Sequence, residues 1–138
     1  MTQTRIGVIG VGYLGKFHAQ KYMAMPEVEL VGVADVNPAF AAEVAAACGT
    51  TPFGDYRELL AQVDAVSVVV PTSLHHEVAS VCLNAGVDVM LEKPMTTTLA
   101  EADALIALAG QEQRLLQVGH IERYNPAVLA MAEHLTQP

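Results

Sequence analysis

The sequence predicts an α/β protein built on a doubly wound parallel sheet with helices on both faces. Short apolar segments rich in β-branched residues alternate with longer helical segments, which is typical of parallel strands joined by right-handed crossovers. A glycine-rich turn, Gly10 to Gly15, follows the first apolar segment. Polar residues gather where the apolar segments end, and in such a sheet those ends share one edge.

Composition and charge narrow the possible classes of protein. The chain has 138 residues, of which 52% are hydrophobic and 16% are charged, so it suits one folded domain with its own core. No apolar run reaches the roughly 18 residues of a membrane span, and we expect no membrane partner. The net charge of −8 argues against binding nucleic acid through bulk charge. Backbone N–H groups can still hold an anionic cofactor.

The cysteines and the start of the chain indicate a compartment. Cys48 and Cys82 both fall in predicted helices, where buried thiols are more expected than a disulfide. Met1 is followed almost directly by the first strand, so we expect no signal peptide. Both features favour a cytoplasmic location. No set of side chains has the spacing of a metal site, so no metal is predicted.

The first strand and the first helix surround the glycine turn. Arg5–Ile9 carries apolar residues on both faces, as a buried parallel strand does. The helix is expected from Tyr13 to Met25, where Pro26 ends it. His18 and Tyr22 lie one turn apart on this helix, and packing is the favoured interpretation for both.

The glycines of the turn have the G-x-G-x-x-G spacing of a dinucleotide-binding turn. Gly10 permits the sharp bend, Gly12 lets the backbone approach a pyrophosphate, and Gly15 lets the helix pack closely on the strand. Tyr13 and Leu14 contribute backbone N–H groups at the helix N-terminus, which attracts anions. By itself this spacing fits many proteins, so the residues downstream decide its meaning.

The second strand, Val28–Ala34, leads to an acidic residue at the expected distance. Asp35 comes 20 residues after Gly15, and a carboxylate there can accept hydrogen bonds from both hydroxyls of the adenosine ribose. It would repel a 2′-phosphate, and its neighbours Val36 and Asn37 include no arginine. We therefore predict NAD as the cofactor, with NADP disfavoured. The alternative is that Asp35 is a helix cap or turn residue.

The elements in the middle of the chain are short. Pro38–Cys48 is alanine-rich and predicted helical, with proline tolerated in its first turn. Thr50–Phe53 is expected as a strand near a sheet edge, because Pro52 cannot donate a ladder hydrogen bond. Asp55 is expected to cap a short helix over Tyr56–Gln62.

The second half of the chain continues the alternation. Ala65–Val70 is apolar on both faces, and Ser73 is expected to cap a helix that ends near Ala85. The remaining elements are predicted as a strand at Val87–Leu91, an amphipathic helix at Thr98–Gln113, a strand at Leu115–Val118 and a helix at Asn125–His134.

The expected strand order is 3-2-1-4-5-6, which places a ligand crevice at the switch point between strands 1 and 4. The loops after strands 1, 2, 4, 5 and 6 should then line one crevice. These loops carry the glycine turn, Asp35, Pro71–His76, Glu92–Pro94 and His120–Asn125.

Several motifs support a family resemblance. G-V-I-G-V-G-Y-L-G-K-F-H-A, A-D-V-N, P-T-S-L-H, L-E-K-P and V-G-H-I-E-R-Y-N-P occur in this order and at fitting distances. Over nearly its whole length the chain resembles the N-terminal half of the Gfo/Idh/MocA oxidoreductases. The last motif is similar to members that oxidise nucleotide-linked amino sugars, such as UDP-N-acetylglucosamine 3-dehydrogenases.

This resemblance implies a Rossmann-type NAD-binding domain over residues 1–119. Residues 120–138 would be a crossover segment and helix leading to a C-terminal α/β substrate domain that this chain lacks. We interpret the chain as a truncated form, inactive by itself, of a protein that is homo-oligomeric at full length.

The resemblance also assigns roles to the residues after strand 5. Lys93 is the catalytic candidate, placed beside the nicotinamide and the reacting hydroxyl, where an ammonium can orient that hydroxyl and stabilise negative charge on oxygen. Glu92 is expected to accept hydrogen bonds from the nicotinamide ribose, and a cis Lys93–Pro94 peptide is predicted. The alternatives are a surface lysine and a solvated loop carboxylate.

The residues after strand 4 are assigned to the cofactor as well. Pro71 and Thr72 are expected beside its ribose and pyrophosphate. His75 matches a histidine of the family's loop and is placed on the nicotinamide side. The alternative is a histidine at a helix start that is hydrogen-bonded to nearby backbone.

His120, Arg123 and Asn125 are the candidate substrate residues, because they follow strand 6 where cofactor and substrate halves meet in the family. The sequence thus predicts an NAD-dependent oxidoreductase domain that moves a hydride between the cofactor and the carbon that bears a hydroxyl of a sugar, cyclitol or nucleotide sugar. The alternative function is a non-catalytic module that binds NAD or a partner protein.

Overall fold

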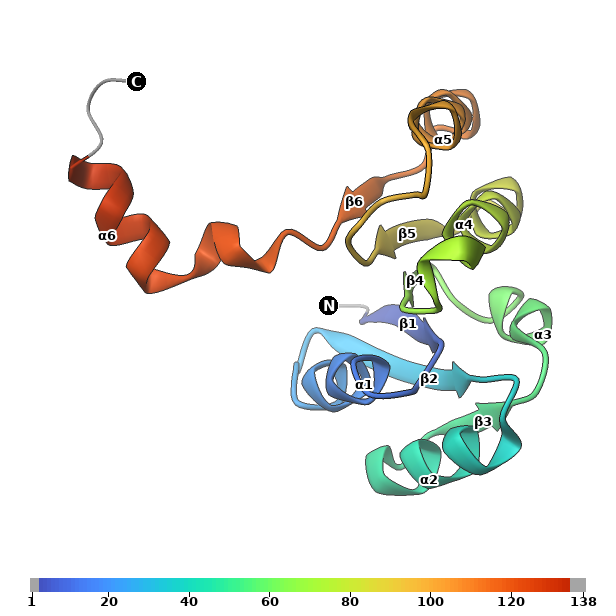
Figure 1. The fold of residues 1–138 in the computed structure, drawn as a ribbon. Coiled ribbons are helices and arrows are strands. Elements are labelled where there is room, and N and C mark those ends of the chain that lie inside the picture. The colour runs from blue at the N-terminus through green and yellow to red at the C-terminus, as the bar shows by residue number, and fades with distance from the viewer. Residues whose placement is uncertain (1–2, 135–138) are drawn as a thin grey trace.

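The protein is described by a computed structural model that covers residues 3–134. Six parallel strands form one sheet in the order β3-β2-β1-β4-β5-β6 (Figure 1). Both the fold class and the strand order are those predicted. The strands are β1 (Thr4–Ile9), β2 (Val28–Ala34), β3 (Thr51–Phe53), β4 (Ala65–Val68), β5 (Asp88–Leu91) and β6 (Leu116–Val118).

Helices follow the strands in alternation. They are α1 (Gly15–Met23), α2 (Pro38–Cys48), α3 (Tyr56–Leu60), α4 (His75–Asn84), α5 (Leu99–Glu112) and α6 (Pro126–His134). Two short 3₁₀ turns, η1 (Thr72–Leu74) and η2 (Ile121–Tyr124), were not predicted.

The two faces of the sheet bury separate cores. Val8 and Val33 pack with α1 and α2, whereas the next residues along the same strands, Ile9 and Ala34, pack with α3, α4 and α5. Successive side chains of a strand point to opposite faces, so these central strands must be apolar throughout. That is why they are recognisable as uninterrupted apolar runs in the sequence.

Local chemistry sets most helix starts. The side chain of Asn37 accepts the N–H of Ala39 at the start of α2, and Asp55 accepts that of Arg57 at the start of α3. Thr98 begins α5 with a reciprocal capping box. β3 lies at the sheet edge, as the proline at its centre requires.

The prediction that Ser73 caps the helix after β4 is wrong. The backbone first makes the turn η1, in which the N–H of Leu74 donates to the carbonyl of Pro71. Leu74 then precedes α4 with no side-chain cap. Ser73 lies inside this turn, one residue too early to cap the helix.

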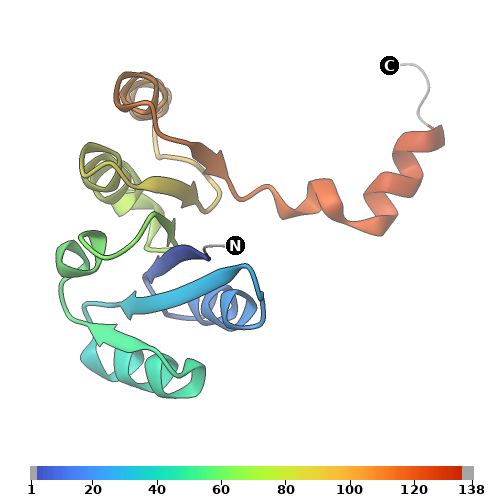
Figure 2. The same cartoon turned by 180° about the vertical axis from the view of Figure 1, so that it is seen from behind.

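The chain leaves the sheet after β6. Figures 1 and 2, which view the molecule from opposite sides, both show η2 and α6 extending away from the body formed by the sheet and the other helices. α6 exposes apolar side chains, including Val128, Leu129 and Met131. Within the described residues, η2 and α6 therefore lie outside the body formed by the sheet and its helices.

Candidate functional site

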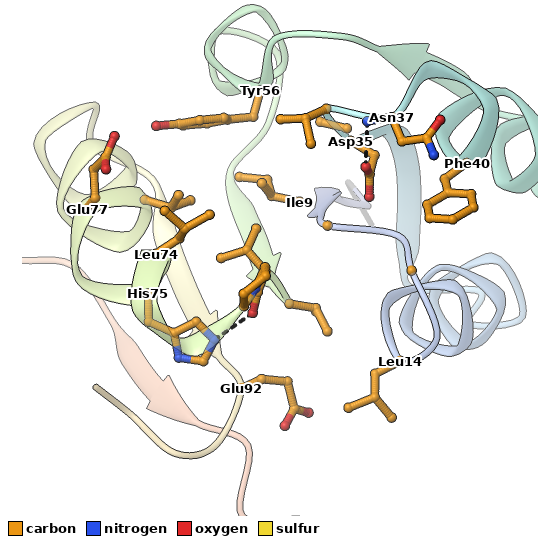
Figure 3. Close-up of a pocket in the computed structure, with 18 of the residues that line it drawn as sticks. Ile9, Leu14, Asp35, Asn37, Phe40, Tyr56, Leu74, His75, Glu77 and Glu92 are labelled. Carbon is orange, nitrogen blue, oxygen red and sulfur yellow. Dashed lines mark hydrogen bonds between the residues drawn. The ribbon is translucent and has the colours of Figure 1, made fainter. Parts of the chain in front are cut away.

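A cleft of about 700 Å³ opens at the carboxyl ends of the central strands. It lies at the switch point between β1 and β4, where a parallel sheet of this order binds ligands. Figure 3 shows Asp35 and Phe40 on one side of it and Leu74, His75 and Glu77 on the other. The predicted residues that line it are Gly10, Gly12, Leu14, Asp35, Pro71, Thr72, His75, Glu92 and Lys93.

The glycine turn has room for a pyrophosphate. Gly10 has a φ of +85°, and a Cβ there would lie 2.8 Å from the carbonyl oxygen of Val69. A Cβ on Gly15 would overlap the carbonyl oxygen of Gly10, so α1 packs directly on the turn. A Cβ on Gly12 would meet no atom within 4 Å, because Gly12 faces the open cleft. The three positions thus fit a dinucleotide for three different reasons.

Asp35 connects the turn to the loop after β2. One of its carboxylate oxygens accepts the N–H of Val11 at 2.8 Å, and the other accepts the N–H of Asn37 at 2.8 Å. Asp35 is therefore a turn residue, as the alternative interpretation held. Each oxygen has a second lone pair, so the same carboxylate can still accept ribose hydroxyls from the cleft that it lines.

Glu92 and Lys93 follow β5 at the opposite end of the cleft. The Lys93–Pro94 peptide is cis, as predicted. Glu92 is buried and its Oε2 accepts the N–H of Lys93 at 3.0 Å. Lys93 is exposed, and its ammonium has no salt-bridge partner within the described residues. The geometry leaves this cation free to face a bound molecule.

His75 is only 1% exposed, and both ring nitrogens face backbone carbonyls. Nδ1 lies 2.9 Å from the oxygen of Pro94, and Nε2 lies 2.9 Å from the oxygen of Val70. This geometry matches the alternative interpretation of a histidine bonded to nearby backbone. His75 thereby joins the loop after β4 to the turn that carries Lys93.

The residues after β6 do not line the main cleft, which corrects the expectation of one shared crevice. His120 and Arg123 line a separate hollow of about 180 Å³. The Asn125 side chain accepts the N–H of Ala127 at the start of α6 and donates to Glu122. β6 is the outermost strand, two strands away from the switch point, so its loop cannot reach the cleft without a turn back that the chain does not make.

The sequence did not indicate the apolar wall of the cleft. Val36, Phe40, Tyr56, Leu74 and Val78 all line it. The hydroxyl of Tyr56 is buried with no hydrogen-bond partner within the described residues, and burial raises its pKa. One feature of the sequence could have indicated this wall. Tyr56 directly follows the capping Asp55, and β3, which pairs with β2, ends just before it at the same edge of the sheet as Asp35.

The favoured interpretation of packing holds for Tyr22, which packs against the core that contains Val8 and Val33. Its hydroxyl also hydrogen-bonds to Ser67 of β4. His18 pairs with Ser67 and Glu92 through its two ring nitrogens, and these contacts were not predicted. In residues 3–134 no group of three metal-ligating side chains is found, and none of the described helices is long and apolar enough to span a membrane.

Comparison with known proteins gives consistent matches. Residues 4–120 match the model of the oxidoreductase family Gfo/Idh/MocA, described as an NAD-binding Rossmann fold. The chain is 52% identical over 128 residues to UDP-N-acetylglucosamine 3-dehydrogenase of Acidithiobacillus ferrooxidans, covering 93% of this chain and 40% of that protein. A solved structure of that enzyme superposes with a TM-score of 0.91 at 49% identity, over 97% of this chain and 44% of the other.

Two further relatives widen the comparison. scyllo-Inositol 2-dehydrogenase (NAD(+)) of Bacillus subtilis is 33% identical over 129 residues, covering 91% of this chain and 38% of that enzyme. The structure of GenD2 from gentamicin A biosynthesis, in complex with NAD, has a TM-score of 0.95 at 27% identity, over 99% of this chain and 40% of the other. The chain spans about 40% of the length of these relatives. It belongs to the Gfo/Idh/MocA oxidoreductase family, of which it forms an NAD-binding Rossmann domain.

Proposed function

We propose that this chain binds NAD across the cleft, with the pyrophosphate at the glycine turn and the nicotinamide beside Lys93. The observation that carries the proposal is that one cleft is lined by the turn, by Asp35 and by the Glu92–Lys93 turn. These features directly follow three different strands, β1, β2 and β5, and their order across the sheet is the one that an extended dinucleotide requires.

The reaction that this arrangement supports is oxidation of a hydroxyl on a sugar, cyclitol or nucleotide sugar. The cofactor supplies a hydride acceptor at C4 of its nicotinamide. The exposed Lys93 ammonium would orient the substrate hydroxyl and stabilise negative charge on its oxygen as the proton leaves. The similarity to UDP-N-acetylglucosamine 3-dehydrogenase favours a nucleotide-linked amino sugar.

A second candidate is a non-catalytic NAD-binding module, because the residues that line the cleft would serve cofactor binding alone equally well. In both cases the chain should bind NAD. They differ in whether hydride transfer follows once a substrate domain is present.

One experiment separates the two candidates. The chain, and a hybrid that joins it to the C-terminal part of the Acidithiobacillus enzyme, would be assayed for NADH formation with UDP-N-acetylglucosamine. We expect no turnover by the chain alone and clear turnover by the hybrid. Lys93→Ala in the hybrid should lower kcat by about 100-fold or more, the range for removing a group that stabilises transition-state charge.

A Lys21→Ala hybrid is the matched control, because Lys21 lies in the last turn of α1 and does not line the cleft. Full turnover by the Lys93→Ala hybrid would remove Lys93 from its role. An unmodified hybrid that binds NAD but forms no NADH would favour the non-catalytic module.

A further inference from the structure

Four polar side chains are hydrogen-bonded in series between α1 and the Glu92–Lys93 turn, on the face of the sheet that α1 covers. The hydroxyl of Tyr22 lies 2.7 Å from Oγ of Ser67, which lies 3.2 Å from Nδ1 of His18. Nε2 of His18 lies 3.2 Å from Oε1 of Glu92. We call these four residues the relay. Its members come from α1, β4 and the residue after β5, so only the folded sheet brings them together.

The relay is largely shielded from water. Ser67 is fully buried, the side chain of His18 is 16% exposed, and that of Glu92 is 9% exposed. An unpaired polar group in such a place costs free energy. Here each side chain is paired with the next, and the thioether of Met90 lies 3.6 Å from both hydroxyl oxygens as a weak additional acceptor.

The chemistry of the partners assigns the hydrogens. A carboxylate only accepts, so the hydrogen between His18 and Glu92 is on Nε2. In a neutral imidazole Nδ1 then accepts from the Ser67 hydroxyl, which in turn accepts from Tyr22. Every hydrogen bond therefore runs from Tyr22 toward Glu92, and no donor is left without an acceptor.

The carboxylate at the end of the relay is held on two further sides. Its Oε2 accepts the backbone N–H of Lys93 at 3.0 Å. A Cβ on Gly119, directly after β6, would lie 3.0 Å from Oε1, so Glu92 also packs closely on that backbone. These contacts hold the Glu92 carboxylate in one orientation. Because that carboxylate also accepts the backbone N–H of Lys93, its position helps to set the position of the backbone that carries the catalytic candidate.

We propose that His18, Ser67 and Tyr22 are positioning residues that orient Glu92, and through it Lys93, toward the nicotinamide end of the cofactor. The inference rests on the proposed function, because it needs Lys93 and Glu92 to face a bound dinucleotide. His18 lies on the helix that begins at the glycine turn, so the relay also fixes the distance between the pyrophosphate end and the nicotinamide end of the cleft.

The test compares two ligands on the purified 138-residue chain. NAD⁺ reaches both ends of the cleft, whereas ADP keeps the adenosine and two phosphates but lacks the nicotinamide riboside. We expect His18→Leu to raise the Kd for NAD⁺ about tenfold, the effect of losing one hydrogen bond to a charged group. The Kd for ADP should stay within about twofold, which also shows that the variant is folded.

Three further variants make the comparison specific. His18→Gln keeps an N–H donor toward Glu92 and should recover most of the affinity for NAD⁺. Tyr22→Phe removes only the outermost donor and should cost about threefold. His76→Leu is the control, since His76 on α4 makes no side-chain hydrogen bond within the described residues and lies outside the relay. It should change neither Kd.

A direct readout of the relay is the tautomer of His18. Nitrogen NMR of the imidazole should show the hydrogen on Nε2 in the wild-type chain, and Glu92→Gln should weaken that preference. An Nδ1–H tautomer in the wild type would overturn the relay.

The two proposals fail in different ways. A His18→Leu chain that binds NAD⁺ as tightly as the wild type, or loses NAD⁺ and ADP equally, would overturn the positioning role alone. A wild-type chain that binds neither ligand would overturn the proposed function, and the positioning role with it.

Discussion

We propose that Asp35 sets the preference for NAD over NADP. Its carboxylate lines the cleft and is fixed by the N–H groups of Val11 and Asn37. A fixed negative charge repels a 2′-phosphate. Arg57 also lines the cleft, but its guanidinium stacks over the ring of Tyr56 at 4.8 Å and lies 3.4 Å from Asp55.

We expect the chain to bind NAD⁺ more tightly than NADP⁺, and Asp35→Asn to remove most of that preference. The amide keeps an acceptor for the turn but loses the charge, so the affinity for NAD⁺ should fall about tenfold while that for NADP⁺ holds or rises. Calorimetric titration of both cofactors measures this, with Arg57→Gln as the companion variant. Tighter binding of NADP⁺ by the wild type would contradict the argument.

At the scale of elements, two glycines of the turn between β1 and α1 are expected to have different roles, Gly12 in binding the cofactor and Gly15 in packing the helix. Gly12 has open space where its Cβ would be, and its φ is not in the left-handed region. Gly15 has none, because α1 packs against the carbonyl of Gly10. Two substitutions of equal size should therefore have opposite signatures.

We expect Gly12→Ala to weaken NAD⁺ binding about tenfold, since the methyl group enters the space for the pyrophosphate, while the free energy of unfolding changes by less than ~0.5 kcal/mol. Gly15→Ala should instead destabilise the fold by about 1–3 kcal/mol, as overpacking does. Urea unfolding and cofactor titration on both variants give the comparison. Equal effects on stability would show that the turn is not packed as described.

A second element-scale feature links β1 to the start of β4. The Arg5 guanidinium and N–H both donate to Asp64, and the contact between Nη2 and Oδ1 is 2.6 Å. These hydrogen bonds lower the pKa of Asp64 from 3.8 to about 2. A lowered pKa means that the carboxylate stabilises the fold above about pH 3.8 and loses this contribution as the pH falls toward 2.

The measurement is the free energy of unfolding of the wild type and of Asp64→Asn between pH 6 and pH 2, at low salt because half-exposed charges are screened. The wild type should be more stable at pH 6, and the difference should shrink below pH 4. A difference that does not change with pH would mean that the charge of Asp64 contributes nothing.

At the scale of the whole molecule, each of the two cores contains one free cysteine, so the reactivity of each thiol measures how often that core opens. Cys48 packs with α1 and α2, and Cys82 packs with α3, α4 and α5. Burial raises the pKa of Cys82 to about 12. The expectation of buried thiols without a disulfide is confirmed.

Because only a thiolate attacks a disulfide reagent, Cys82 should not react at pH 8 in the folded protein. Its labelling rate should follow global unfolding and rise with urea. Cys48 is 7% exposed, and its labelling rate should follow opening of the smaller core, between the sheet and α1 and α2. Mass spectrometry of the labelled protein distinguishes the two sites. Rapid labelling of Cys82 without denaturant would show that the larger core opens locally.

Most of the fold could be predicted, because it depends on features that are local in the chain. The apolar strands, the proline in β3 and the cap Asp55 each act within a few residues, and all were predicted. The capping box of Thr98 is equally local but was not predicted. The prediction failed at Ser73, where an unrecognised turn displaced the helix start. It also failed to place the loop after β6, since no local pattern says that a chain will turn away from its own sheet.

The sequence by itself determined the α/β class, the strand order, the glycine turn and the family, because periodicity, glycine spacing and motif order are properties of the chain. Only the tertiary structure decided which side chains are partners. His18 and Glu92 are 74 residues apart, and His75 and Pro94 are 19 apart. No spacing rule joins such pairs, because their contact depends on how crossovers stack the strands. Hydrogen bonds between residues far apart in the chain give His18 partners on β4 and directly after β5, and they join His75 to the turn that carries Lys93.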